Sequence, residues 1–298
     1  MESVFDGMRE LPMLWLTCCA LLGGMAASFA GVAAWRMRER LPLLMGELPA
    51  NGEDPAALMD RTSLWARSKC EGCGRGLGFL DLLPVLGWLA RRGRCPTCGH
   101  HVSARYPLTE LASAILFTAL GWVHGPSWQT LVIMLMAAIL LAAAWMDWEN
   151  YCITDELLVP CILVGLYLPA FEPSANLRLW GAAAAGGFML MGMVIGKIWN
   201  KDAPVAWGDV MLMAAGGAFL GLDCFPTLTI LSVVIMAAYA IPMRVWGLGR
   251  PTTKMHEAVL DGTDPRSVPM GPAIAAAIVV ISFSPGLWAT SLSSLLLP

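Results

Sequence analysis

Four cysteines form two pairs whose spacing is typical of a metal site. Two residues separate Cys70 from Cys73 and Cys95 from Cys98, and 21 residues lie between the pairs. Each Cys-x2-Cys pair can supply two thiolates to one tetrahedral ion. Four thiolates close the coordination shell of Zn²⁺, so we expect a structural zinc that leaves no position for a catalytic water. A redox-active dithiol pair is the alternative interpretation of this spacing.

Two aspartates border apolar stretches of the sequence. Asp147 directly follows one such stretch, and Asp209 lies at the start of another. An ionisable group in or beside a membrane span is costly and is a functional hypothesis by default. Two facing carboxyl groups share one proton, so that one can activate water while the other polarises a peptide carbonyl. The alternative is that each is a solvated residue at a helix end. Asp209 would suit the N-terminus of a helix, where a negative charge is stabilised.

Two further residues accompany this candidate pair. Gly208 precedes Asp209, and its missing side chain would let backbone or substrate come close. Asp155 lies eight residues after Asp147, just before the next apolar stretch. We expect Asp155 to cap that helix or to contact the substrate.

The composition indicates which kind of fold positions these residues. Hydrophobic residues make up 57% of the 298 residues, charged residues make up 14%, and the mean hydropathy is +0.63. Soluble domains carry about 25% charged residues. The chain is therefore predicted to be an all-α membrane protein in contact with membrane lipid. Its net charge of −3 gives no indication of a nucleic-acid partner.

About eight stretches approach the length of about 20 apolar residues that a membrane-spanning helix needs. A polar segment, 36–106, contains the cysteine pairs, and a polar loop, 247–268, precedes the last stretch. We therefore predict a first transmembrane helix in 1–35, a zinc-ribbon-like domain in 36–106 and a seven-helix core in 107–298. The eight apolar stretches are 12–35, 107–123, 129–146, 156–171, 179–199, 208–222, 226–246 and 269–293.

The basic residues predict the orientation of the chain, because Lys and Arg are enriched on the cytoplasmic side of membranes. Residues 36–106 contain 11 of the 19 basic residues. With this segment in the cytoplasm and eight alternating spans, 17 basic residues lie inside, and only Arg9 and Arg178 lie outside. We expect Asp147 and Asp209 at the cytoplasmic ends of their helices, at one membrane depth.

Five segments resemble, in order, the motifs of bacterial type IV prepilin peptidases. In 66–110 the cysteine pairs flank a D-x-x-P-x-x-G-x-L segment, and R-Y-P-L-x-E follows. Residues 27–42, ASFAGVAAWRMRERLP, are similar to the family's G-S-F-L-N-V-x-x-x-R-L-P. MDWENYCITDELLVP (146–160) resembles D-x-x-x-x-x-x-P-D-x-L, AWGDVMLM (206–213) resembles G-x-G-D-x-K-L, and VPMGPAIAAA (268–277) resembles P-x-G-P-x-L-A.

This resemblance implies an intramembrane aspartyl protease of the bacterial inner membrane, with its zinc domain and active site on the cytoplasmic side. Such enzymes remove the leader from type IV prepilins or pseudopilins, and many then methylate the new N-terminus with S-adenosylmethionine. The family's catalytic aspartates match Asp147 and Asp209, and the acidic residue of its P-D element matches Asp155. Ala206 and Met211 replace a glycine and a lysine of the family motif.

Two other classes of function stay open at this point. A proton-coupled transporter also uses intramembrane carboxylates, although transporters usually show matched halves, and no such repeat is evident. The other is a non-catalytic assembly protein, whose zinc domain would dock components of a pilus or secretion machine.

Overall fold

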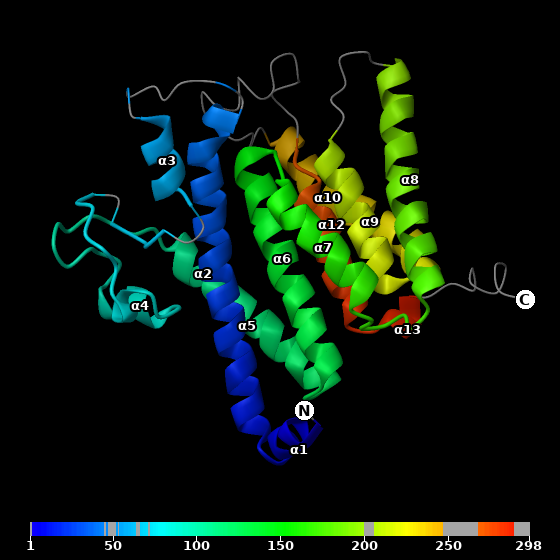
Figure 1. Cartoon of the computed structure of the whole chain (residues 1–298), viewed down its shortest axis with the longest axis horizontal. Helices are drawn as coiled ribbons and strands as arrows, with labels where there is room; N and C mark the ends of the chain where they lie inside the picture. Colours follow the sequence, from blue (N-terminus) through cyan, green and yellow to red (C-terminus); the bar gives the residue numbers. More distant parts are fainter. Residues whose placement is uncertain are drawn as a thin grey trace, which may run out of the picture. The chain divides into compact units, whose positions relative to one another are not determined.

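The structure is a computed structural model that describes residues 2–44, 46, 52, 54–63, 66–70, 72–199, 206–246 and 268–288. The described residues are helical apart from turns, loops and two isolated antiparallel bridges near the cysteine pairs (Figure 1). They divide into two compact units, Met1–Ser127 and Trp128–Pro298. The predicted all-α class is therefore confirmed. The predicted loop 247–268 lies outside the described residues except for Val268.

The N-terminal unit is built on the long helix α2, which packs against α5. Small residues make this contact close. A side chain on Gly23 would meet Ser113 and Phe117, and one on Gly121 would meet Cys19. The helices of this unit are α1 Glu2–Glu10, α2 Pro12–Leu44, α3 Pro55–Arg61, the 3-10 turn η1 Phe79–Asp81, α4 Leu86–Ala90 and α5 Arg105–His124.

In the C-terminal unit, α12 packs against α6, α9 and α10. The core is aliphatic, as expected of helices whose sequences are apolar on all sides. The largest fully buried side chains in this unit include Met136, Leu140, Leu158, Leu212, Phe219, Leu228, Ile274 and Ile278. Its helices are α6 Trp128–Asn150, α7 Asp155–Tyr167, α8 Ala175–Trp199, α9 Trp207–Leu220, η2 Leu222–Cys224, α10 Phe225–Val245, α12 Gly271–Ser282 and α13 Pro285–Trp288.

Helices α8 and α9 approach each other closely through glycines. A side chain on Gly181 would overlap the carbonyl oxygen of Gly217, and one on Gly217 would overlap that of Gly181. Small residues allow this approach and are common between membrane helices, where dispersion contacts replace the hydrophobic effect as the main attraction. This contact holds α9, and with it Asp209, against α8.

Five helices are long and apolar enough to cross a membrane, so the chain is a membrane protein. They are Pro12–Met37, Arg105–His124, Trp128–Asn150, Ala175–Trp199 and Leu222–Met243. Each of the other three predicted spans coincides with a shorter helix: α7 has 13 residues, α9 has 14 and α12 has 12. The predicted count of eight spans is therefore not confirmed. A 14-residue helix is only about 21 Å long, shorter than the hydrocarbon layer of about 30 Å.

Along the chain, the boundary between the two units lies between Ser127 and Trp128. The sequence-based boundary at 106/107 follows composition, since it separates polar residues from an apolar helix. The packing instead groups α5 with α2. The grouping of 107–298 as the peptidase core stays a prediction.

Candidate active site and metal centre

The two cysteine pairs fold into turns with the same hydrogen-bond pattern. Cys70 N–H donates to the Arg75 carbonyl at 2.8 Å, and Gly74 N–H donates back to the Cys70 carbonyl at 2.9 Å. In the second turn Cys95 bonds in the same way to His100, and Gly99 to Cys95, each at 2.9 Å. Gly74 and Gly99 have φ of 69° and 71°, a left-handed conformation that favours glycine. The same knuckle turn therefore occurs at both cysteine pairs.

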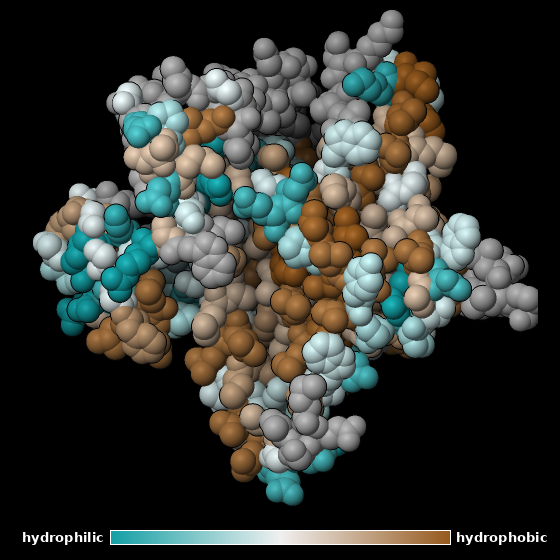
Figure 2. Space-filling view, in the orientation of Figure 1, coloured by the Kyte–Doolittle hydropathy of each residue, from teal (hydrophilic) through white to brown (hydrophobic). Residues whose placement is uncertain are grey.

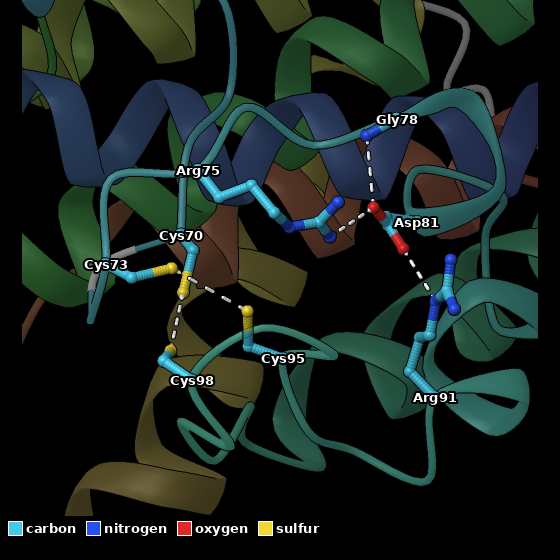
Figure 3. A network of polar contacts seen from close by, with 8 residues as sticks. All are labelled: Cys70, Cys73, Arg75, Gly78, Asp81, Arg91, Cys95 and Cys98. Atoms are coloured by element: carbon cyan, nitrogen blue, oxygen red, sulfur yellow. Dashed lines mark hydrogen bonds and ion pairs between the residues drawn. The ribbon is translucent and has the colours of Figure 1, made fainter.

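The four sulfur atoms converge at one point (Figure 3). All lie within 4.8 Å of one another, and Sγ–Sγ distances are 3.7 Å from Cys70 to Cys98 and 4.0 Å from Cys73 to Cys95. Thiolates around a tetrahedral Zn²⁺ at about 2.3 Å would be about 3.8 Å apart. Backbone N–H groups of Cys98 and then Thr97 lower the pKa of Cys95 to about 6, whereas burial and hydrogen bonds with the other three cysteines raise the pKa of Cys98 to about 12. The cluster thus holds one thiolate readily, and a cation would stabilise the others. The residues present therefore fit a structural zinc ion.

A carboxylate network lies beside the sulfur cluster (Figure 3). Asp81 accepts hydrogen bonds from Arg75 at 2.7 Å, from Arg91 at 2.8 Å and from the Gly78 N–H at 3.1 Å. These three donors stabilise the ionised form of the carboxylate. The Asp81 side chain is only 8% exposed. This network ties the segment between the cysteine pairs to the first knuckle.

In the C-terminal unit, Asp147 lies near the end of α6 and is buried. Its Oδ2 accepts a 2.8 Å hydrogen bond from the backbone N–H of Gly271, and Gly271 is the first residue of α12. The first N–H groups of a helix have no partner within the helix, so Asp147 satisfies one of them. A side chain on Gly271 would lie 2.6 Å from that same oxygen. Glycine is therefore the residue that lets α12 approach this carboxylate.

Asp209 lies in the first turn of α9, close enough to Asp147 for the two charges to interact. A side chain on Gly208 would lie 3.3 Å from Ile153, so the glycine lets α9 lie close to the turn after α6. Asp155 is exposed in the first turn of α7, a position in which a carboxylate suits the helix dipole. The structure thus brings Asp147 and Asp209 together and places Asp155 at a helix end.

Sequence reasoning assigned no role to two residues at this site, Gly271 and Tyr239. Gly271 belongs to the P-x-G-P element, which was quoted only as a resemblance, and its contact joins residues 124 positions apart. The Tyr239 hydroxyl donates to the carbonyl of Pro269, two residues before Gly271, and its ring meets Trp148 edge-on at 6.0 Å. No sequence signal marks this tyrosine.

The two departures from the family motif lie at the start of α9. Ala206 is the N-cap of α9 with φ of −84°, a conformation open to any L-residue. The backbone there does not require the glycine that Ala206 replaces. Met211 lies in the helix two residues after Asp209, without the charge of the lysine it replaces.

The comparisons with known proteins agree across most of the chain. The model described as "Bacterial Peptidase A24 N-terminal domain" matches residues 21–124, and that of the "Type IV leader peptidase family" matches 134–241. A "Prepilin leader peptidase/N-methyltransferase" from Stutzerimonas stutzeri is 31% identical over 281 residues, covering 89% of both chains. A protein with the same description from Aeromonas hydrophila is 28% identical and covers 93% of both.

A third relative, from Escherichia coli O78:H11, is described as "Type 4 prepilin-like proteins leader peptide-processing enzyme". It is 28% identical over 80% of this chain and 89% of its own length. No solved structure matches. The Stutzerimonas relative is more than 30% identical to this chain over well above two thirds of both chains. The chain therefore belongs to the type IV leader peptidase family.

Proposed function

We propose that this protein is a membrane-embedded aspartyl endopeptidase that removes the leader from type IV prepilins or pseudopilins and then methylates the new N-terminus. The peptidase assignment is supported by the electrostatic interaction between Asp147 and Asp209, in a chain whose relatives are described as leader peptidases. The methyltransferase activity rests on the descriptions of those relatives, and S-adenosylmethionine is the methyl donor it requires. No residues are assigned to that donor.

The hydrogen bonds around the pair suggest a division of roles. Asp147 accepts the Gly271 N–H, and a hydrogen bond donated to a carboxylate stabilises its ionised form. We therefore assign Asp147 as the base that takes a proton from the attacking water. Asp209 would then hold the shared proton and donate a hydrogen bond to the scissile carbonyl. The resulting tetrahedral intermediate collapses with cleavage of the C–N bond, when the leaving amine takes up the proton that Asp147 removed from the water.

The zinc ion would take no part in this chemistry, because four thiolates close its coordination shell. The four cysteines all belong to the N-terminal unit, whereas both aspartates belong to the C-terminal unit. When bound, zinc would cross-link the two knuckles and stabilise the fold of the segment between them. The four cysteines would hold the ion, and the hydrolysis would rest on the aspartates alone.

Orientation follows from the distribution of charge. We propose that the zinc-binding segment and the aspartate pair lie on the cytoplasmic side of the bacterial inner membrane, where most of the Lys and Arg residues would then lie. The basic leader of a prepilin would meet this side, while its apolar helix stays in the membrane. Exposed Asp155 is the carboxylate we assign to attract the leader.

The test is to incubate the reconstituted protein with a purified prepilin and S-adenosylmethionine carrying an isotopically labelled methyl group. The product's N-terminus is then read by mass spectrometry. We expect one cut at the leader junction and one labelled methyl group on the new amine. A cut without the methyl group would remove the transferase part of the proposal, and an uncut prepilin would remove the peptidase part.

A further inference from the structure

In the segment between the two cysteine pairs, apolar side chains are exposed and an acidic side chain is buried, the reverse of the usual arrangement in water. Phe79 is 78% exposed and Leu80 is 63% exposed, whereas the Asp81 side chain between them and Leu82 is only 8% exposed. Leu86 and Leu89 on α4 are exposed as well. In water, a fold gains free energy by burying such residues and solvating the carboxylate. We call these exposed residues the apolar loop: Phe79, Leu80, Leu82, Leu86 and Leu89.

The only acidic group within this segment is fully paired. Asp81 binds Arg75, Arg91 and the Gly78 N–H, so its charge is compensated inside the fold. Charged groups that lie in or beside lipid are paired in this way and turned toward the protein interior. The outer surface of the segment therefore presents hydrocarbon and no carboxylate.

The contacts of Pro84 place this segment beside the middle of a membrane span. A side chain on Gly24 would lie 2.8 Å from Pro84 Cβ, so the Pro84 ring packs closely against α2 at Gly24. Gly24 lies 12 residues from Pro12 and 13 from Met37, the two ends of the apolar span in α2. At a rise of about 1.5 Å per residue, it is about 18 Å from either end.

Glu110 of α5 anchors the segment at this position. Its Oε2 accepts a 2.7 Å hydrogen bond from the Val85 N–H, where Val85 adopts a φ of 62° that is unusual for a β-branched residue. Within hydrocarbon, backbone that is not helical must find its partners in the protein. The Trp88 indole N–H also has a partner, the Val102 carbonyl at 2.9 Å. These two polar groups of the turn thus find their partners within the protein.

The apolar loop also continues a surface that faces lipid. Exposed apolar side chains cover the spans next to it, and Figure 2 shows hydrophobic surface over α4 beside hydrophilic surface of the same unit. The exposed Arg92 and Arg94 follow α4 directly, and cations at this border suit anionic headgroups. The exposed apolar residues of these spans include Leu21, Leu22, Met25 and Phe29 on α2 and Leu108, Leu111 and Ile115 on α5.

We propose that residues 79–90 form a re-entrant loop immersed in the bilayer against α2 and α5, with lipid acyl chains as the partner of the apolar loop. The polar segment 36–106 is then not entirely aqueous. Its zinc knuckles would be tied to the membrane from both sides of the loop, which fixes the height of the metal centre relative to the spans. The occupant is lipid because the loop lies beside the middle of a span and its one carboxylate is buried and paired with two arginines.

The test uses the full-length protein in nanodiscs that contain phosphatidylglycerol. A clickable non-natural residue replaces Leu80 or Leu86 and carries a fluorophore, so the zinc cysteines stay untouched. Ile115, on the exposed face of α5, is the matched lipid control, and exposed Ala57 on α3 is the matched water control. Fluorescence is quenched either by phospholipids spin-labelled on the acyl chain or by aqueous iodide. Only variants that retain one zinc per chain are compared.

The proposal predicts that labels at positions 80 and 86 are quenched by the labelled lipid like the label at 115, and at least threefold more than the label at 57. Iodide should show the opposite order. Quenching of both loop labels by iodide, with the efficiency seen at position 57, would overturn the proposal. So would protection from lipid and iodide alike that depends on added prepilin, because the loop would then be a protein-binding surface.

Discussion

The backbone N–H of Gly271 donates a 2.8 Å hydrogen bond to Oδ2 of Asp147. This contact orients a buried carboxylate from a second helix and satisfies the first N–H of α12 at the same time. It is the clearest geometric support for treating the P-x-G-P element as part of the catalytic machinery. The element had no assigned role in the sequence.

Replacing Gly271 with alanine should therefore impair catalysis. The new Cβ would meet Asp147 Oδ2 at 2.6 Å and force the carboxylate or α12 to move. We expect kcat for prepilin cleavage to fall at least tenfold, about 1.4 kcal/mol in activation free energy, with KM little changed. Gly286→Ala is the control, since a side chain there meets nothing within 4 Å. Unchanged kcat in Gly271→Ala would contradict the orienting role.

Tyr239→Phe removes the hydroxyl that bonds the Pro269 carbonyl. Without this bond, the backbone that leads into α12 should be held less firmly. We therefore expect kcat to fall severalfold, while KM stays the same. The control is Tyr167→Phe, because Tyr167 is 73% exposed. Cleavage rates of the two variants, measured side by side at equal zinc content, check this expectation. Equal rates in both variants would show that the Pro269 contact does not matter for catalysis.

Cys98→Ser should abolish stoichiometric zinc binding, because one of four closing ligands is lost. We expect zinc content, measured by elemental mass spectrometry, to fall from one ion per chain to near zero. Cys18→Ser is the control and should retain the metal, since Cys18 is not in the sulfur cluster. A protein loaded with cadmium should cleave prepilin at an undiminished rate. A rate that changes with the metal would contradict a purely structural role.

The metal centre was predictable because it depends on local spacing. Each Cys-x2-Cys pair fixes its own turn, and the following glycines supply the left-handed residues that the turns require. The aspartate pair was predictable for another reason, since a carboxylate next to an apolar stretch stands out in the sequence. Their proximity, however, depends on helix packing, and only the structure supplies it.

The contacts of Gly271 and Tyr239 could not be predicted, because they join positions that no periodicity relates. Composition also could not determine how many helices cross the membrane. Helices such as α9 and α12 are apolar but short, and an apolar core helix resembles a membrane span in sequence. The exposure of apolar residues around the buried Asp81 could not be predicted either, because 36–106 is polar on average and contains only a short apolar segment.

Gly217→Ala tests the contact between α8 and α9. The added methyl group would overlap the carbonyl oxygen of Gly181, so the helices must separate. Overpacking of this kind costs about 1–3 kcal/mol. We expect a lower unfolding temperature in detergent, followed by intrinsic fluorescence. Gly187→Ala, on the open side of α8, is the control and should unfold at the temperature of the parent protein. A Gly217 variant as stable as this control would contradict the close packing.

The measurement that tests the central claim most directly is prepilin cleavage by the Asp147→Asn and Asp209→Asn variants, each reconstituted beside the parent protein. The variants must retain one zinc per chain and the parent's unfolding temperature. Asn keeps the shape of the side chain but cannot hold or transfer the shared proton. The account predicts a loss of at least a thousandfold in cleavage rate for each variant, with uncut prepilin accumulating. Cleavage by either variant at the parent's rate would contradict the assignment of these two aspartates as the catalytic pair.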